Sequence, residues 1–306
     1  MRIVFMGTPD YSVKTLEALI DKGHDIAAVF AQPDKPVGRK QILTPPPTKE
    51  YALQNGINVY QPKTLRDGEA LKIIKELAPE VIVVVAYGKI LPKEILEYPK
   101  YGCVNGHASL LPKLRGASPI QWAIVSGETE TGVTAMLMDE GMDTGDILET
   151  ETVKIGDNET GEELFERLSD ISARLMIKTL DDLQNGAVKP KKQDESKATY
   201  APIIKKEMAL IDFNKSAKEV FNAVRGFYSW PCAYFTLDGK RVKVLSCKIN
   251  DKCGEPSTVI ESDNKLIIAC CDKSVELLDV QPEGSKVMTA SQMLCGRKIE
   301  VGKKVN

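Results

Sequence analysis

The chain has 306 residues, of which 42% are hydrophobic and 27% charged, and its formal net charge is −2. This length exceeds one hydrophobic core, so we expect about two domains, and the near-neutral charge excludes indiscriminate nucleic-acid binding while leaving room for a local basic patch. No run approaches the ~20 apolar residues of a membrane span, so we expect no membrane contact and a location in the cytoplasm.

The first half of the chain alternates between strand and helix patterns. Arg2–Met6 is apolar and indicates a strand, Val13–Leu19 places its leucines on one helical face, and His24–Ala31 indicates the next strand. The alternation continues through Tyr51–Gln54, Leu71–Leu77, Val81–Val85, Cys103–His107, Ile120–Val125 and Gly132–Met138. Alternating elements of this kind predict an α/β fold with a Rossmann-like, mostly parallel sheet.

A parallel sheet is also the scaffold of dinucleotide-binding proteins, so the residues after the first strand matter. They read Gly7-Thr8-Pro9-Asp10 and do not form Gly-x-Gly-x-x-Gly, and no Walker sequence occurs in the chain. We therefore expect the protein to use neither a nicotinamide cofactor nor ATP.

The next pattern is a long helix followed by a change of composition. Thr160 and Glu163 form a capping box, and leucines at helical spacing follow until Gly186. The segment from Val188 to Thr199 contains a proline and several lysines without apolar periodicity, which is typical of a linker. We predict a first domain over 1–189, a linker over 190–206 and a second domain over 207–306.

The second domain combines one helix, Ser216–Arg225, with short strands. These strands are predicted over Ala233–Leu237, Val242–Ile249, Ser257–Glu261, Lys265–Ala269 and Val275–Val280. Five short strands suit a small OB-like β-barrel, a common platform for nucleic acids. The seven cysteines are odd in number and form no Cys-x-x-Cys pair, so we expect reduced thiols and no metal site.

The chemistry-bearing residues lie at the end of a predicted strand. Asn105 and His107 are two residues apart, so their side chains project from the same face. An amide can donate to a developing oxyanion, and an imidazole can exchange a proton near neutral pH. Each residue alone could equally have a structural role, Asn105 as the cap of the following turn and His107 as a hydrogen-bonded histidine of the core.

The surrounding motifs distinguish these readings. Asn105-Gly106-His107, the following Ser109-Leu110-Leu111-Pro112 and the distant Asp143 together resemble the folate-dependent formyltransferases. The resemblance implies that Asn105, His107 and Asp143 are catalytic and that 10-formyltetrahydrofolate is the co-substrate. Further segments match in order and spacing the branch that formylates methionine carried by initiator tRNA, namely Met1–Asp10, Gln32–Arg39, Val83–Gly88 and Arg115–Gln121. This implies methionyl-initiator tRNA as partner, with the OB-like domain contacting tRNA, and we expect a monomer.

Two further regions receive binding roles from the resemblance. The folate slot would be walled by the residues Ser109, Leu110, Leu111, Pro112, Val84, Val85, Ala86, Tyr87 and Gly88, with ordinary strand-end packing as the alternative. A long loop carries Lys35, Arg39 and Lys40 between prolines and glycine, and the corresponding family loop enters the tRNA acceptor stem. A solvated basic loop is the default interpretation of such a run.

Gly106 departs from the family pattern, which has valine or isoleucine between the catalytic pair. The missing side chain is expected to loosen the strand where positioning counts. Three alternatives stay open, and only the last of them follows from Gly106. The protein could formylate a small amine such as a glycinamide ribonucleotide or an amino sugar nucleotide, it could hydrolyse formyltetrahydrofolate, or it could bind tRNA or folate with an impaired site.

Overall fold

The computed structural model describes residues 1–38, 40–296 and 298–306. These residues form two compact units. The first comprises Met1–Pro119, Thr131–Val153 and Phe165–Ala201, and the second comprises Ile120–Glu130, Lys154–Leu164 and Pro202–Asn306. The predicted division into 1–189, 190–206 and 207–306 follows chain order, whereas the units alternate along the chain, and that division stays a prediction.

The first unit is built on a seven-stranded sheet with the strand order β5-β2-β1-β6-β7-β8-β9. Its strands are β1 (Arg2–Gly7), β2 (Asp25–Phe30), β5 (Val59–Tyr60), β6 (Val81–Val85), β7 (Cys103–His107), β8 (Glu130–Leu137) and β9 (Ile147–Lys154). Neighbours from β5 to β7 run parallel, and β8 runs antiparallel to β7. The central strand β6 is a continuous run of β-branched residues because both of its faces are buried.

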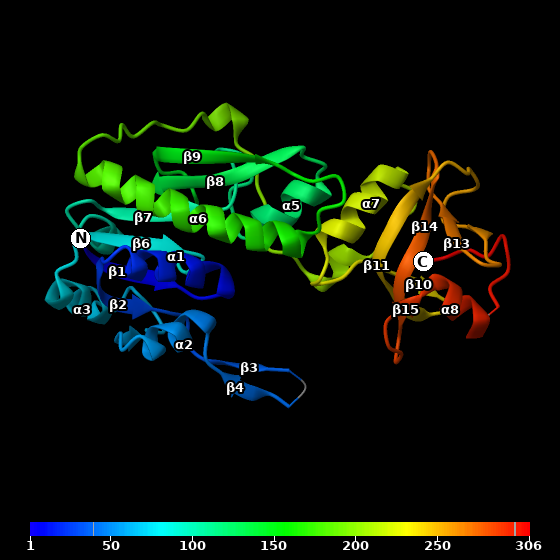
Figure 1. Ribbon diagram of the computed structural model, residues 1–306, viewed down its shortest axis with the longest axis horizontal. Helices are drawn as coiled ribbons and strands as arrows, with labels where there is room; N and C mark the ends of the chain where they lie inside the picture. Colours follow the sequence, from blue (N-terminus) through cyan, green and yellow to red (C-terminus); the bar gives the residue numbers. More distant parts are fainter. Residues whose placement is uncertain (39, 297) are drawn as a thin grey trace. The chain divides into compact units, whose positions relative to one another are not determined.

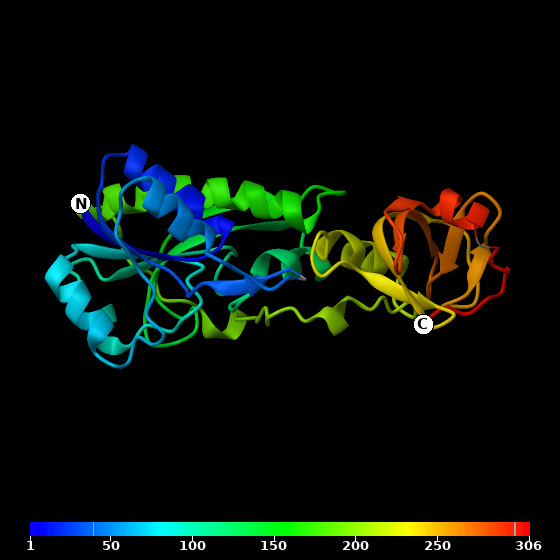
Figure 2. The same ribbon diagram turned by 90° about the horizontal axis from the view of Figure 1, so that it is seen from below.

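Helices cover both faces of this sheet, as Figure 2 shows: α1 and α6 lie on one face and α3 on the other. The helices of this part are α1 (Asp10–Asp21), α2 (Pro47–Gln54), α3 (Glu69–Leu77), α4 (Lys93–Leu96) and α6 (Gly161–Gln184). The predicted capping box at Thr160 and Glu163 forms, since each backbone N–H is accepted by the other side chain, at 2.9 and 3.3 Å. A two-stranded hairpin, β3 (Lys35–Val37) and β4 (Ile42–Thr44), stands apart from the sheet (Figure 1).

The second unit contains an antiparallel sheet with the strand order β10-β11-β14-β13-β12, and β15 pairs with β14. Its strands are β10 (Tyr234–Leu237), β11 (Lys240–Asn250), β12 (Val259–Glu261), β13 (Leu266–Ala269), β14 (Ser274–Pro282) and β15 (Met288–Thr289), and the helices are α5 (Pro119–Val125), α7 (Ala217–Gly226) and α8 (Ala290–Gly296). Ser216 caps α7 in a reciprocal box with Glu219. The core of this unit gathers apolar side chains from α7, α8 and the inner face of the sheet.

The predicted fold class is confirmed: a mostly parallel α/β sheet is accompanied by a separate antiparallel C-terminal β domain. The hairpin β3–β4, the edge strand β9 and the helix α8 were not predicted. Among the described residues, no helix is long and apolar enough to cross a membrane. The described part of the chain likewise holds no group of three His, Cys, Asp or Glu side chains arranged to bind a metal ion. All seven cysteines are free thiols, four of them buried and three exposed.

Candidate active site

Asn105 and His107 come from β7, between a parallel and an antiparallel neighbour. Asn105 lies opposite Val84 of β6 and Met136 of β8, and His107 lies opposite Thr134 of β8. Alternation along the strand puts both side chains on one face, as the sequence predicts. Both residues are almost fully buried, with 9% of Asn105 and 6% of His107 exposed, so the sheet holds them rigidly.

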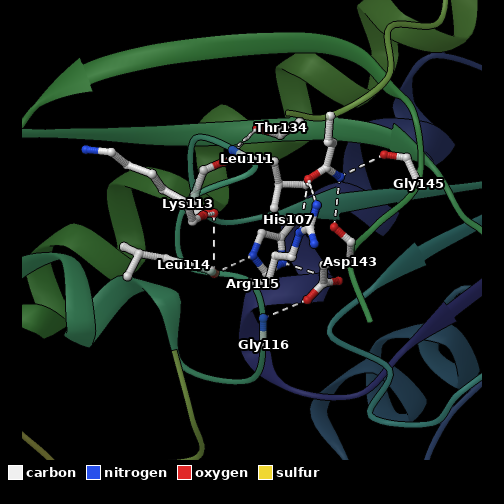
Figure 3. A network of polar contacts seen from close by, with 11 residues as sticks. His107, Leu111, Lys113, Leu114, Arg115, Gly116, Thr134, Asp143 and Gly145 are labelled. Carbon is white, nitrogen blue, oxygen red and sulfur yellow. Dashed lines mark hydrogen bonds and ion pairs between the residues drawn. The ribbon is translucent and has the colours of Figure 1, made fainter. Parts of the chain in front are cut away.

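The imidazole of His107 is held from both ends (Figure 3). Its Nε2 lies 2.9 Å from the carbonyl oxygen of Leu114, and its Nδ1 lies 3.7 Å from Oδ1 of Asp143. A carbonyl only accepts hydrogen bonds, so Nε2 carries a hydrogen toward Leu114, and Nδ1 is the nitrogen that faces the carboxylate of Asp143. The Leu114 carbonyl thus selects Nε2 as the ring nitrogen that carries a hydrogen.

Asp143 lies in the loop between β8 and β9 in a left-handed backbone conformation, with φ +55°. Such a conformation is uncommon for a residue with a side chain and needs support from its surroundings. Oδ2 accepts a hydrogen bond of 2.8 Å from the backbone N–H of Gly116. Gly145 permits the loop to fold this tightly, because a Cβ there would lie 1.8 Å from the carbonyl oxygen of Leu137. The carboxylate is thereby aimed at the histidine ring.

The loop after β7 is held by hydrogen bonds to Thr134 of β8 and by one within the loop. Thr134 donates to the carbonyl of Ser109 at 2.7 Å and accepts from the N–H of Leu111 at 3.2 Å. The hydroxyl of Ser109 donates to the carbonyl of Lys113 at 2.6 Å, and Ser109 is fully buried. Figure 3 shows Thr134, Leu111 and Lys113 around His107 in this arrangement. The loop therefore presents the Leu114 carbonyl to His107 as a fixed group.

Arg115, in the same loop, is 1% exposed although it is charged. It donates two hydrogen bonds to the carboxylate of Glu195, at 2.9 and 2.6 Å, and two to Oε1 of Gln193, at 3.1 and 2.8 Å. A buried charge is tolerated only when it is paired in this way. The hydrogen bond from Arg115 lowers the pKa of the Glu195 carboxyl below its usual value.

Gly106 faces away from the pair, toward helix α6. A Cβ at this position would lie 2.9 Å from Ser172 Oγ, 3.5 Å from Met176 Cε and 3.7 Å from Val85 Cγ2. The strand is continuously paired here, with Gly106 opposite Ala135 of β8. The expected loosening is therefore not seen, because Ser172 and Met176 occupy the volume that a larger residue would take.

The residues expected to wall a folate slot divide into two groups. Val84, Val85 and Tyr87 belong to the buried core, and burial raises the pKa of Tyr87 to about 12. Ala86 and Gly88 are exposed just beyond the carboxyl end of β6, with positive φ angles of 47° and 81°. In the loop after β7, Ser109 and Leu111 are buried while Leu110 and Pro112 are half-buried.

Two cavities lie beside the loop that carries Asp143, and most of their lining was not predicted. One, of about 460 Å³, is lined chiefly by Leu96 with Gly102 and by Leu137–Gly141, directly before Asp143. The other, of about 480 Å³, is lined by Ile90–Ile95 together with Leu65, Arg66, Gly68, Leu71 and Glu140. Both volumes fall within the range of small-molecule sites. Only the stretch Ile90–Ile95 of the second cavity closely follows the Tyr87-Gly88 motif in the chain, so the sequence held a signal for that part alone.

The basic loop is the hairpin β3–β4. Lys35 and Lys40 are exposed on it, and Val37, Ile42 and Leu43 expose 55 to 65% of their surface. Arg39, the third predicted contact, lies outside the described residues. At the hairpin's base, hydrogen bonds from Gln61 and Lys49 lower the pKa of the Asp34 carboxyl. These bonds anchor the base of a hairpin on which the side chains of Lys35 and Lys40 are exposed.

Comparison with known proteins decides the family. The chain matches a formyl transferase family model over residues 1–180 and the model of a formyl transferase C-terminal domain over residues 203–298. The chain belongs to the formyl transferase family. It is 48% identical over 300 residues to a methionyl-tRNA formyltransferase of Thermodesulfovibrio yellowstonii, covering 98% of this chain and 97% of that protein.

Solved structures share the fold at lower sequence identity. A methionyl-tRNA formyltransferase from Clostridium thermocellum has a TM-score of 0.56 at 24% identity, covering 83% of this formyl transferase and 95% of that chain. An N-formyltransferase from Helicobacter canadensis, in complex with folinic acid and dTDP-3-aminofucose, has a TM-score of 0.69 at 22% identity, covering 92% and 98%. These two likenesses concern the fold, while the family models carry the assignment.

Proposed function

We propose that this formyl transferase moves the formyl group of 10-formyltetrahydrofolate to the α-amino group of methionine on initiator tRNA. The observation that supports it most is the approach of His107 to Asp143, with Asn105 two residues before His107 on β7, within a chain that is 48% identical, over nearly its whole length, to a methionyl-tRNA formyltransferase. All three residues come from one chain, which agrees with a monomeric enzyme. The proposed substrate places the reaction in the cytoplasm, where initiator tRNA is charged.

We propose that the cavity of about 460 Å³ beside the Asp143 loop receives the folate ring system. Its lining combines the apolar residues Leu96, Leu137 and Met138 with the charged residues Lys93, Glu97, Asp139 and Glu140. When bound there, the co-substrate supplies a formyl carbon on a nitrogen leaving group. We place its ring system in this cavity, with Ala86 and Gly88 and the loop Ser109–Pro112 along the path to His107.

The geometry suggests a division of labour among the three residues. The Asn105 amide would donate to the formyl oxygen as negative charge develops there. Nδ1 of His107 is the nitrogen not tied to Leu114, so it would take the proton from the attacking amine and return it to the leaving nitrogen. Asp143, 3.7 Å from Nδ1, would stabilise the charged imidazolium.

Recognition of tRNA is assigned to the hairpin and to the C-terminal β domain. Lys35 and Lys40 extend from β3–β4, and we place Arg39 with them from the sequence alone. Phosphate contacts by such side chains would make binding fall with salt.

A comparison of acceptors tests this function. Purified protein and 10-formyltetrahydrofolate are given initiator methionyl-tRNA, elongator methionyl-tRNA, glycinamide ribonucleotide, an amino sugar nucleotide or no acceptor. Rapid transfer restricted to the initiator tRNA is expected. Transfer to a small amine, release of formate without acceptor, or tRNA binding without transfer would each replace the proposal with one of the alternatives.

A further inference from the structure

The segment over residues 191–201, here called the strap, is hydrogen-bonded to both loops that build the site. Its Lys191 exchanges two backbone hydrogen bonds of 2.8 Å with Ile147 at the start of β9. Its Thr199 accepts from the N–H of Arg115 at 2.9 Å, and its Ala201 donates to the carbonyl of Arg115 at 2.7 Å. The composition of this segment predicted a linker, whereas its contacts make it part of the first unit.

Gln193 lies in the strap and uses its whole side-chain amide. Its Oε1 accepts from Nε and Nη2 of Arg115, and its Nε2 donates to the carbonyl oxygens of Asp143 and Gly145, both at 2.8 Å. Two donated and two accepted hydrogen bonds use the full capacity of a side-chain amide. A side chain bound in this way has one orientation, and it fixes the turn on which Asp143 stands.

The Asp143 turn needs such support. Its left-handed backbone is held through the carbonyl by Gln193, and its carboxylate is held by the N–H of Gly116. Arg115 precedes Gly116 in the chain and is itself bound to Gln193, so one amide connects both supports. A shift of this turn would move the carboxylate relative to His107, and positioning errors of about 1 Å can cost on the order of 100-fold in rate.

We infer that Gln193 is a positioning residue for the proposed formyl transfer and acts by holding Asp143 against His107. This inference rests on the proposed function for its effect on rate, but its structural part stands on the hydrogen bonds alone. Glu195 contributes indirectly, because its carboxylate fixes the Arg115 guanidinium to which Gln193 binds.

The test compares Gln193→Met and Gln193→Glu with the same changes at Gln54, an exposed residue at the end of α2. Methionine keeps the length of the side chain and loses all four hydrogen bonds. Glutamate keeps an acceptor for Arg115 and loses the two donors to Asp143 and Gly145. We expect both Gln193 variants to lower kcat about 10- to 100-fold with KM for folate and tRNA within twofold, and the Gln54 variants to match the parent.

A double-mutant cycle distinguishes positioning from general structural damage. If Gln193 acts through Asp143, Gln193→Met will cost less than twofold further in an Asp143→Asn background. An equal loss in both backgrounds, or unchanged kcat in both Gln193 variants, would overturn the inference. Should Gln193→Met not fold, Gln193→Glu is decisive by itself, because it keeps Arg115 paired.

Hydrogen exchange gives a readout that does not depend on activity. The Gly116 N–H donates to the Asp143 carboxylate, so its exchange should be at least about tenfold faster in Gln193→Met than in Gln54→Met. Equal exchange would contradict the inference even in an active enzyme. A parent protein that formylates no acceptor would refute the proposed function, while the exchange result would still decide whether Gln193 holds Asp143.

Discussion

Replacing Gly106 by alanine tests how the strand of the catalytic pair is packed. The new Cβ would lie 2.9 Å from Ser172 Oγ, well inside normal contact, while its distances to Met176 and Val85 are ordinary. Overpacking of a tight core costs roughly 1 to 3 kcal/mol. Alanine also reduces the conformational entropy of the unfolded chain relative to glycine, which raises the free energy of unfolding by about 0.4 to 1 kcal/mol. We therefore expect Gly106→Ala to lower the free energy of unfolding by about 1 to 2 kcal/mol.

Urea unfolding of four proteins measures this effect: the parent, Gly106→Ala, Ser172→Ala and the double variant. Because the clash involves the Ser172 hydroxyl, Ser172→Ala should restore most of the stability lost in Gly106→Ala, giving a coupling of about 1 kcal/mol. Formyl transfer should be close to the parent's in the double variant, since Gly106 faces α6 and not the site. A Gly106→Ala protein as stable as the parent, or losses that simply add, would refute the packing account.

Three further predictions concern single interactions. The buried Tyr87 hydroxyl has no hydrogen-bond partner within the described chain, so Tyr87→Phe should leave stability unchanged or raise it by up to about 1 kcal/mol, and a loss beyond 1 kcal/mol by thermal unfolding would contradict this. Lys35→Ala with Lys40→Ala should raise KM for tRNA, leave KM for folate unchanged and flatten the salt dependence of tRNA binding, whereas an unaltered salt slope would remove the hairpin from the interface. Arg115 lowers the pKa of the Glu195 carboxyl in the folded protein, so as the pH falls this carboxyl is protonated in the unfolded chain first. The stabilisation from the ion pair is therefore full above about pH 5 and declines below it. The difference in unfolding free energy between the parent and Glu195→Gln should shrink from pH 7 to pH 4, and a pH-independent difference would contradict the ion pair.

The sequence predicts the central elements of the fold because their patterns are strong. The run Val81–Val85 favours a buried strand because it is short and entirely β-branched, and Cys103–His107 was predicted with its observed bounds. The hairpin β3–β4 was not predicted because each of its strands has only three residues. Strand β3 contains a proline, and both strands expose their apolar side chains. Strand β9 was not predicted because it lies at the edge of the sheet, and its threonines and glutamates interrupt the apolar alternation that indicates a strand.

The sequence predicts only part of the candidate site, because several of its residues act through the backbone or lie in a segment of linker-like composition. Asn105, His107 and Asp143 can be identified from the sequence because their side chains are part of a motif, and the structure brings His107 and Asp143 together. Leu114 and Gly116 act through a backbone carbonyl and a backbone N–H, which leave no trace in residue type. Gln193 stands in a lysine-rich, proline-containing segment, where composition indicates a linker and conceals its contacts.

The most direct test of the central claim is the single-turnover rate of initiator methionyl-tRNA formylation by the parent protein and by His107→Ala at saturating 10-formyltetrahydrofolate. The parent should form formyl-methionyl-tRNA, and His107→Ala should do so roughly 10²- to 10⁴-fold more slowly, the range for loss of a general acid-base group. Binding of tRNA should be equal in both proteins. Equal rates in the two proteins, or no formylation by the parent, would contradict the account.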